Sequence, residues 1–374
     1  MATVFESTRL GNISLKNRTV HSATWNGMAD DDGYSTREID VLVEDLAYGE
    51  VGLIITGHAY VHPDGKVSAR QLGVYSDRHI EGLSRMVETV HNVGGKIALQ
   101  LSHAGCHSEP LMTGVEPMGP SIMMNENIPY CRAITEQEIN RLVSDFTHGA
   151  IRAKEAGFDG VQLHGAHGYL ISQFLSPFYN RRHDRYGGNI INRARIVVDI
   201  VENIQQEIGK DYPVMIKMNS EDFVEGGLTV GEMLEMVAIF ENIGITAVEL
   251  SGGLIRYSGN NGPARKGVLN TEEEVYYLNA ASSYKRCCTM PLMLVGGIRS
   301  YNVAERLIKE GITDYVSFSR PLIREPHLIK QWKAGDTGKA SCISCNSCLN
   351  AARQEGKLYC VVQAQRTINN TMLL

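Results

Sequence analysis

Several features that define large classes of protein are missing from this sequence of 374 residues. No apolar run approaches the roughly 20 residues that a membrane-spanning helix needs. The first residues, Met1–Glu6, lack the charged and apolar blocks of a signal peptide, so we expect a cytoplasmic protein without a membrane partner. Asp and Glu (42) outnumber Lys and Arg (36), which argues against a nucleic-acid-binding protein.

The composition is that of an ordinary folded protein, with 43% hydrophobic and 21% charged residues and no low-complexity linker. Short apolar runs, each followed by a helical pattern, recur along the chain. The expected strands are 17–23, 51–56, 97–101, 160–164, 214–218, 247–251, 292–296 and 315–319. The expected helices are 37–49, 77–93, 135–157, 192–208, 230–242, 272–285, 301–310 and 326–333. Eight such alternations predict an α/β fold, a (β/α)₈ (TIM) barrel, rather than an open sheet.

The clearest helix begins at Thr135, where Thr135 and Glu138 form a capping-box pattern, and Gly157 stands where a left-handed helix stop is expected. The connections after the third, fourth and sixth strands are long. In a barrel these loops belong to the catalytic rim, so their length favours an enzyme.

Polar residues gather where the predicted strands end. His164 and His167 can converge on one carbonyl oxygen, and the phenol of Tyr169 could release a proton. The alternative is a buried tyrosine with two hydrogen-bonded core histidines. Lys217 and Gln100 lie in otherwise apolar strands, and a lysine that points into a barrel needs an anion, unless it points outward between strand and helix.

The last two units carry Gly296-Gly297 and Ser319-Arg320 directly after their strands. Loops after the seventh and eighth strands of a barrel commonly form a phosphate site, because glycine lets backbone N–H groups approach the oxygens. The paired glycines and arginine therefore predict a phosphate-binding site.

Together these segments resemble the Old Yellow Enzyme family of FMN-dependent NAD(P)H:flavin oxidoreductases, in the branch of 2,4-dienoyl-CoA reductase and trimethylamine dehydrogenase. The resemblance covers nearly the whole chain. It rests on 15–18, on 100–105 and above all on 156–170, and it continues through 173–177, 180–182 and 185–188.

The resemblance implies an FMN lying across the barrel mouth. Ser22, Ala23, Thr24 and His58 would contact its ring and Gln100 its pyrimidine edge. Lys217 would lie beside N1, at a position that is usually Arg. The implied phosphate ligands are Gly296, Gly297, Ser319 and Arg320.

The implied reaction is an ene reduction of an α,β-unsaturated carbonyl or acyl thioester. Hydride passes from NAD(P)H through the flavin to the β-carbon, His164 and His167 hold the substrate oxygen, and Tyr169 protonates the α-carbon. Trp25 replaces a smaller residue near the flavin and is expected to contact substrate. Cys106 stands where the family motif usually has Arg.

Four of the eight cysteines crowd the C-terminal tail with Cys-x₂-Cys-x₂-Cys-x₁₁-Cys spacing. Such a set suits an iron–sulfur cluster or zinc. In the resembling branch this location carries a [4Fe–4S] cluster, which implies Cys342, Cys345, Cys348 and Cys360 as ligands. We therefore expect an FMN-binding barrel over residues 1–335 and a cluster-binding extension, packed on the barrel, over residues 336–374.

The implied partners are an electron-transfer protein, unless direct hydride delivery makes the cluster dispensable, and a second copy of the chain in a homo-oligomer. Three alternatives stay open on the residues alone. They are an amine dehydrogenase whose electrons leave through the cluster, a non-redox aldolase or isomerase with Lys217 as Schiff base, and a zinc-clipped binding module without activity.

Overall fold

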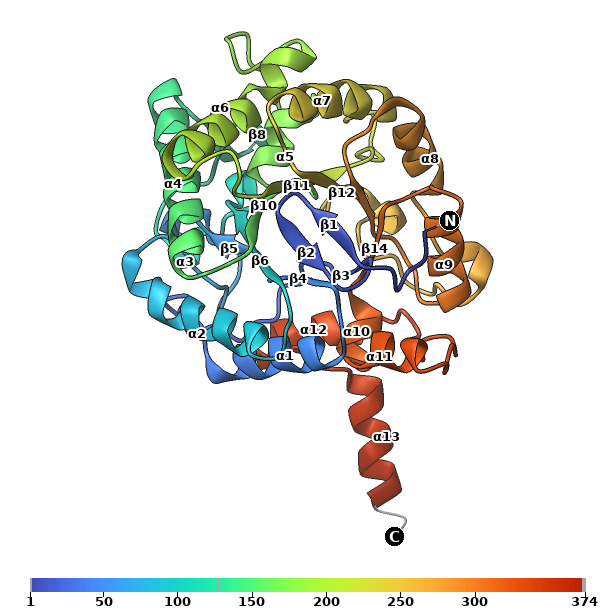
Figure 1. Cartoon of the computed structure of the whole chain (residues 1–374). Coiled ribbons are helices and arrows are strands. Elements are labelled where there is room, and N and C mark those ends of the chain that lie inside the picture. The colour runs from blue at the N-terminus through green and yellow to red at the C-terminus, as the bar shows by residue number, and fades with distance from the viewer. Residues whose placement is uncertain (1, 127, 372–374) are drawn as a thin grey trace.

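Parallel strands close into a barrel in the computed structural model, which describes residues 2–126 and 128–371. Around the barrel these strands are β3 (Thr19–His21), β4 (Leu53–Ile55), β6 (Ile97–Ser102), β10 (Gly160–Gly165), β11 (Val214–Asn219), β12 (Ala247–Ser251), β13 (Leu292–Leu294) and β14 (Tyr315–Phe318). Pairing of β14 with β3 and of β10 with both β6 and β11 leaves no open edge. The predicted (β/α)₈ barrel is confirmed (Figure 1).

Every residue of these strands is buried, which explains why they appear in the sequence as nearly continuous apolar runs. The first strand is shorter than the predicted 17–23. Asn17 lies outside it because its side chain binds the backbone of Thr19 and of Glu50. At the other end the strand stops at His21, and the next residues, Ser22, Ala23 and Thr24, line a cavity.

Helices surround the barrel. They are α1 (Arg37–Tyr48), α2 (Ile80–His91), α3 (Pro110–Thr113), α4 (Glu136–Glu155), α5 (Leu170–Leu175), α6 (Ile190–Ile208), α7 (Val230–Asn242), α8 (Leu278–Cys287), α9 (Tyr301–Lys309), α10 (Arg320–Arg324) and α11 (Leu328–Lys333). The capping box of α4 is present: Thr135 Oγ1 accepts from Glu138 N at 3.2 Å, and Glu138 Oε2 accepts from Thr135 N at 2.9 Å. Gly157 ends this segment at φ +92°, as predicted.

The predicted helix 272–285 is wrong at its start. A short 3₁₀ turn occupies Thr271–Glu273, and α8 begins only at Leu278. Val275 between them has φ +62°, which breaks a helix. The interruption lets Tyr276 and Tyr277 fold back toward the loop after β13, where Tyr276 N donates to Gly296 O at 3.2 Å.

A hairpin that the sequence did not announce closes the N-terminal end of the barrel. Its strands are β1 (Thr8–Leu10) and β2 (Ile13–Leu15), and it lies over the centre of the ring in Figure 1. Leu10, Ile13 and Leu15 pack with inward residues of the barrel strands in one buried cluster. The other end of the barrel therefore remains for chemistry.

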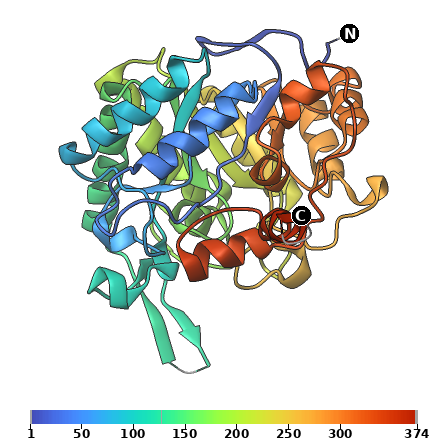
Figure 2. The ribbon, with the colours of Figure 1, turned by 90° about the horizontal axis from the view of Figure 1, so that it is seen from below.

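An arm follows β6 in the chain. Strand β6 also pairs with the short strand β5 (Ala59–Tyr60). The arm consists of β7 (Met118–Gly119), β8 (Met123–Asn125) and β9 (Ile128–Ala133), and it projects from the barrel in Figure 2. Cys106, after β6, forms a disulfide with Cys131 of β9, with Cα atoms 5.1 Å apart. This bond at the base of the arm was not predicted.

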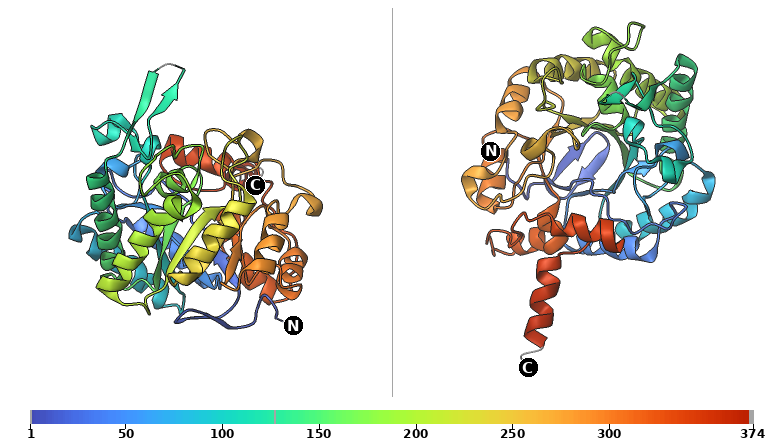
Figure 3. Two further views of the ribbon diagram at one scale, coloured as in Figure 1. Left: turned by 90° about the horizontal axis from the view of Figure 1, so that it is seen from above. Right: turned by 180° about the vertical axis from the view of Figure 1, so that it is seen from behind.

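After α11 the chain returns across the barrel and forms α12 (Ser347–Glu355) and α13 (Val361–Thr371). Ala340, Cys348, Ala352 and Leu358 are buried in the main hydrophobic core, so this segment packs on the barrel as far as α12. Helix α13 projects away from the rest (Figure 3). Within the described residues, no helix is both long and apolar enough to cross a membrane.

Candidate active site

A cavity of about 220 Å³ opens at the carboxyl ends of the barrel strands. The side chains around it come from different strands and meet only because the barrel closes. The predicted residues among them are Ser22, Ala23, Thr24, Trp25, His58, Gln100, His164, His167, Tyr169, Lys217 and Ser319. The structure thus brings to one cavity the residues that the resemblance assigns to ring binding and those that it assigns to catalysis.

A chain of buried polar side chains crosses the floor of this cavity. Gln100 Nε2 donates to Gln162 Oε1 at 2.7 Å, and Gln162 Nε2 donates to Glu249 Oε2 at 3.0 Å. Lys217 Nζ lies 3.2 Å from the same Glu249 oxygen and donates to Ser22 Oγ at 2.7 Å. Strand register explains the contact, since Lys217 stands opposite Glu249 in the ladder between β11 and β12.

The sequence reading missed Glu249 and Gln162, although each is a polar residue that interrupts the apolar run of a buried strand. Burial opposes ionisation of Glu249, but the Lys217 ammonium and hydrogen bonds from Ser22 and Gln162 hold the pKa of this carboxyl below its usual value. Lys217 therefore points inward and pairs with an anion. A Schiff-base lysine must be a free amine, so this pairing disfavours the aldolase alternative.

His164, His167 and Tyr169 surround one part of the cavity. The ring of His164 lies 5.2 Å from that of His167 and 4.9 Å from that of Tyr169, and His58 lies 5.5 Å from Tyr169. His167 Nε2 is 2.8 Å from Ser251 Oγ. The Nδ1 atom of His164 is buried without a hydrogen-bond partner among the described residues. Because a buried polar atom without a partner is costly, this atom is available for a ligand oxygen.

Burial sets the protonation of these groups. It lowers the pKa of His164 well below 6.5, helped by the charges of His167, His58 and Lys217. The pKa of His167 is lowered in the same way, by burial first and then by Lys217 and His58. Burial raises the pKa of Tyr169 to about 12. At neutral pH the two imidazoles are neutral and the phenol keeps its proton.

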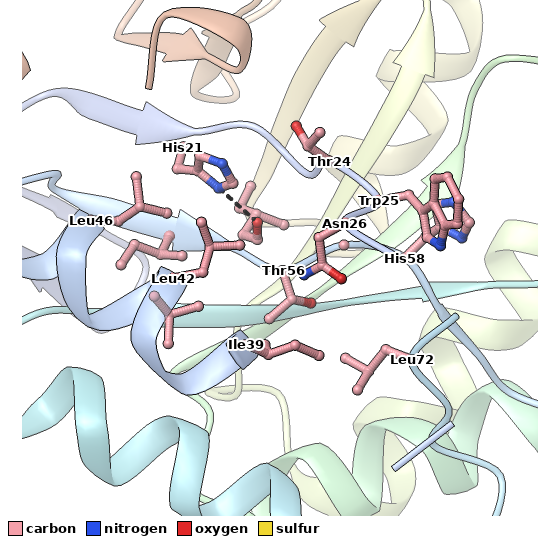
Figure 4. A pocket seen from close by; sticks show the side chains of 14 residues that line it. His21, Thr24, Trp25, Asn26, Ile39, Leu42, Leu46, Thr56, His58 and Leu72 are labelled. Atoms are coloured by element: carbon pink, nitrogen blue, oxygen red, sulfur yellow. Dashed lines mark hydrogen bonds between the residues drawn. The ribbon is translucent and has the colours of Figure 1, made fainter. Parts of the chain in front are cut away.

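Trp25 and His58 stand between this cavity and a second, mainly apolar pocket. Figure 4 shows the second pocket, with Ile39, Leu42, Leu46 and Leu72 on its walls and the dashed hydrogen bond from His21. Thr24 lines both cavities as well. Gln71 Nε2 lies 2.8 Å from His58 Nδ1, which fixes the His58 ring at this wall.

Three of the four predicted phosphate residues line an adjoining cavity of about 80 Å³. Gly297, Ser319 and Arg320 belong to it, and Ser319 also lines the first cavity, so the two cavities lie next to each other. Ser317 Oγ is buried here without a partner among the described residues. Gly297 has φ +78°, and a Cβ on it would lie 2.7 Å from the Tyr276 ring. Gly296 does not line the cavity, but its carbonyl accepts from Tyr276 N.

Arg320 lies at the boundary between this phosphate cavity and the cysteines of the tail, of which Cys342 also lines the phosphate cavity. The Nη1 atom of Arg320 donates to Arg265 O and to Asn346 Oδ1, both at 2.7 Å. A further cavity lies on its other side, and Arg320 and Cys342 line both. The cysteines that line the further cavity are Cys342, Cys345, Cys348 and Cys360, and all four are free thiols.

Within the described residues, no group of three or more His, Cys, Asp or Glu side chains is placed to hold a metal ion. A single zinc held by thiolates has four sulfurs at about 2.3 Å from one centre. A [4Fe–4S] cluster binds each thiolate through a different iron, so its ligands stand around a cavity rather than around a point. The four thiols about one cavity fit such a cluster in their chemistry.

The 220 Å³ cavity and the 80 Å³ cavity beside it, here the wide and the narrow part of one site, fit FMN. The wide part offers Gln100, Lys217 and the orphaned His164 nitrogen, and the narrow part offers Ser317, Arg320 and a glycine backbone in the left-handed region. The tail also contributes residues that the sequence did not indicate. Leu349 and Arg353 of α12 line the wide cavity, so the extension forms part of its wall.

Comparison with known proteins places this geometry in context. The family model for NADH:flavin oxidoreductases and NADH oxidases matches residues 3–337. The chain is 36% identical to an NADH oxidase of Thermoanaerobacter brockii over 96% of its own length and 55% of that protein. It is 34% identical to an NADPH dehydrogenase of Clostridium acetobutylicum, covering 87% of this chain and 93% of that one.

Among solved structures, 2-naphthoyl-CoA reductase in complex with 2-naphthoyl-CoA superposes with a TM-score of 0.88 at 26% identity. The match covers 96% of this chain and 56% of that one. The chain thus spans about half the length of the first of these relatives, and about half of this structural neighbour.

Proposed function

The chain belongs to the NADH:flavin oxidoreductase / NADH oxidase family, and on that premise we propose that it is an FMN-dependent ene-reductase. Its substrate would be an α,β-unsaturated carbonyl compound or acyl thioester. The observation that carries the proposal is the convergence of His164, His167 and Tyr169 on one cavity above the Lys217–Glu249 pair.

FMN, when bound, would supply the hydride that NAD(P)H delivers. Gln100 and Lys217 would bind its ring, with Ser22, Ala23, Thr24 and His58 around it. Gly297, Ser319 and Arg320, with Gly296 shaping the loop, would hold its phosphate. Glu249 offsets the Lys217 charge, so the floor presents a dipole rather than a free cation to the ring.

His164 and His167 would hold the substrate oxygen. Both are neutral at pH 7, so each has one N–H to donate, and the oxygen gains negative charge as the β-carbon is reduced. One well-placed donor to such an oxygen contributes roughly 3–4 kcal/mol to the transition state. The Tyr169 phenol would give its proton to the α-carbon, and a pKa of about 12 keeps that proton in place until the carbanion forms.

We propose that the four tail cysteines hold a [4Fe–4S] cluster that exchanges electrons with a separate protein. This proposal rests on their common cavity and on Arg320, which borders both this cavity and the phosphate cavity. The division into a barrel over residues 1–335 and an extension over residues 336–374 goes with it.

The test is anaerobic reduction of 2-cyclohexenone by flavin-loaded protein with NADH or NADPH. The proposal predicts cyclohexanone in a one-to-one ratio with the NAD(P)H consumed. Consumption of NAD(P)H that does not respond to the enone, with the enone recovered unchanged, would contradict it.

A further inference from the structure

Two arginines at the rim of the cavity have no part in the reaction described so far. Arg353 of α12 lines the cavity directly. Arg256 lies in the loop after β12 and follows Ile255, which also lines the cavity. Both side chains are exposed to solvent. They come from segments far apart in the sequence, and the cavity is lined by Arg353 itself and by Ile255, the residue before Arg256.

In the part of the chain that the structure describes, Arg256 and Arg353 form no side-chain hydrogen bond and no ion pair. Other arginines are engaged: Arg193 pairs with Glu232, and Arg320 binds backbone carbonyls. The charge of Arg256 and Arg353 is therefore available to a ligand.

Arg353 and Tyr169 line the same cavity, and the backbone beside Arg256 is held near them, because Ile255 N donates to His167 O at 3.2 Å. Burial raises the pKa of Tyr169, and the charges of Arg353 and Arg256 oppose that rise. Arg256 acts in the same direction on neighbouring Tyr179 and Tyr130. A substrate that is placed to receive the Tyr169 proton would extend its remaining part toward these two guanidiniums.

We propose that Arg256 and Arg353 form a binding site for an oxyanion group of the substrate. The inference rests on the proposed function, because it extends the substrate of that same site. A guanidinium binds a carboxylate or phosphate through two parallel N–H donors, which is the recognition that suits an unpaired arginine at a cavity mouth. The anion is a carboxylate on a small unsaturated acid or the phosphates of an acyl thioester carrier. The same two charges repel cationic amines and so disfavour the amine dehydrogenase alternative.

The first experiment measures binding without turnover, by calorimetry on flavin-loaded protein. The probes are 3-benzoylpropionate and its methyl ester, which share one shape and differ in charge. Arg256→Gln and Arg353→Gln should each weaken binding of the acid about threefold, and the double variant about tenfold, because exposed ion pairs contribute modestly. Binding of the ester should stay within about twofold of wild type.

Arg306→Gln on α9 is the matched control, because Arg306 is an exposed arginine on an outer helix. A second pair of probes separates the two sources of the anion: cinnamoyl-CoA, and cinnamoyl-N-acetylcysteamine, which lacks the phosphates. If the arginine variants lose affinity only for the acid, the bound anion is a carboxylate. If they lose affinity only for the CoA ester, the bound anion is a phosphate. Either result supports the proposal.

The proposal is overturned if the double variant keeps the wild-type preference for both charged probes, or if Arg306→Gln loses as much. Because these are binding measurements, they stand even if the protein fails to reduce 2-cyclohexenone. Conversely, if wild type reduces the neutral methyl 3-benzoylacrylate while the double variant binds the charged probes as wild type does, the proposed function stands and the anion site fails.

Discussion

Charged side chains are paired on the floor of the active-site cavity and unpaired on its rim among the described residues. On the floor, Lys217 is 3% exposed and Glu249 is fully buried, and each has its partner within 3.2 Å. On the rim, Arg256 and Arg353 are exposed and unpaired among the described residues. A buried charge must be neutralised to be tolerated, whereas an exposed one is hydrated and stays free to bind. The floor is thus suited to hold a fixed cofactor and the rim to choose among substrates.

The largest expected effect lies between these two regions, at Tyr169. Tyr169→Phe removes the proposed proton donor and leaves the floor unchanged. Substrate reduction should slow by about 10²–10⁴-fold, which is the usual contribution of a positioned acid. Reduction of the bound flavin by NAD(P)H should keep its wild-type rate. Anaerobic stopped-flow absorbance separates the two half-reactions.

Tyr48→Phe is the control for this variant, because Tyr48 is 50% exposed at the end of α1. Equal slowing of both half-reactions in Tyr169→Phe would show that the tyrosine supports the fold or the cofactor instead of donating a proton.

Breaking the floor should reduce stability. Glu249→Gln leaves the Lys217 ammonium buried without a counter-charge, and unpairing a buried ion pair costs about 3 kcal/mol or more. The midpoint of urea unfolding should fall accordingly. Lys217→Met combined with Glu249→Gln removes both charges and should recover part of the loss. If the single variant is as stable as wild type, the floor does not depend on charge neutralisation.

The cysteine cavity beyond Arg320 can be tested separately. Anaerobically purified protein should contain about four irons and about four sulfides per chain, and Cys345→Ser should lose most of them. Cys287→Ser is the matched control, because Cys287 is an exposed free thiol on α8. Equal iron content in both variants would contradict the proposal that these cysteines bind the cluster.

The smallest expected effect is that of pH. The Tyr169 proton is present below its pKa of about 12, and His164 and His167 are neutral above their lowered pKa values. Between about pH 6 and pH 9 none of the three should change its charge, so the rate constant of substrate reduction should stay constant. A bend near pH 6.5 in stopped-flow measurements would show a histidine that titrates in the site.

Much of this arrangement could be predicted because periodicity and strand-end position follow from local sequence. Each barrel strand is buried on both faces and so forms an apolar run, and His164, Lys217 and Gln100 interrupt such runs. Barrel closure then brings these interruptions to one cavity. The start of α8 was misplaced because the contact that draws Tyr276 to Gly296 is made with a distant loop.

Residues whose role depends on a partner far along the chain were missed. The role of Glu249 depends on its ion pair with Lys217 on the neighbouring strand. The role of Cys131 depends on its disulfide with Cys106 across the base of the arm. Arg353 reaches the cavity only because the tail folds back over the barrel. None of these pairings has a local signature, so no pattern in the sequence could assign them.

The most direct test of the account follows the atoms that the product gains. Reduction of 2-methylcyclohexenone with NAD(P)H deuterated at the transferred position should place deuterium on the β-carbon. The same reaction with unlabelled cofactor in D₂O should place deuterium on the α-carbon. Mass spectrometry and NMR of the product that show this pattern would support transfer between a cofactor on the floor and Tyr169. An allylic alcohol, or a β-carbon labelled from solvent, would contradict it.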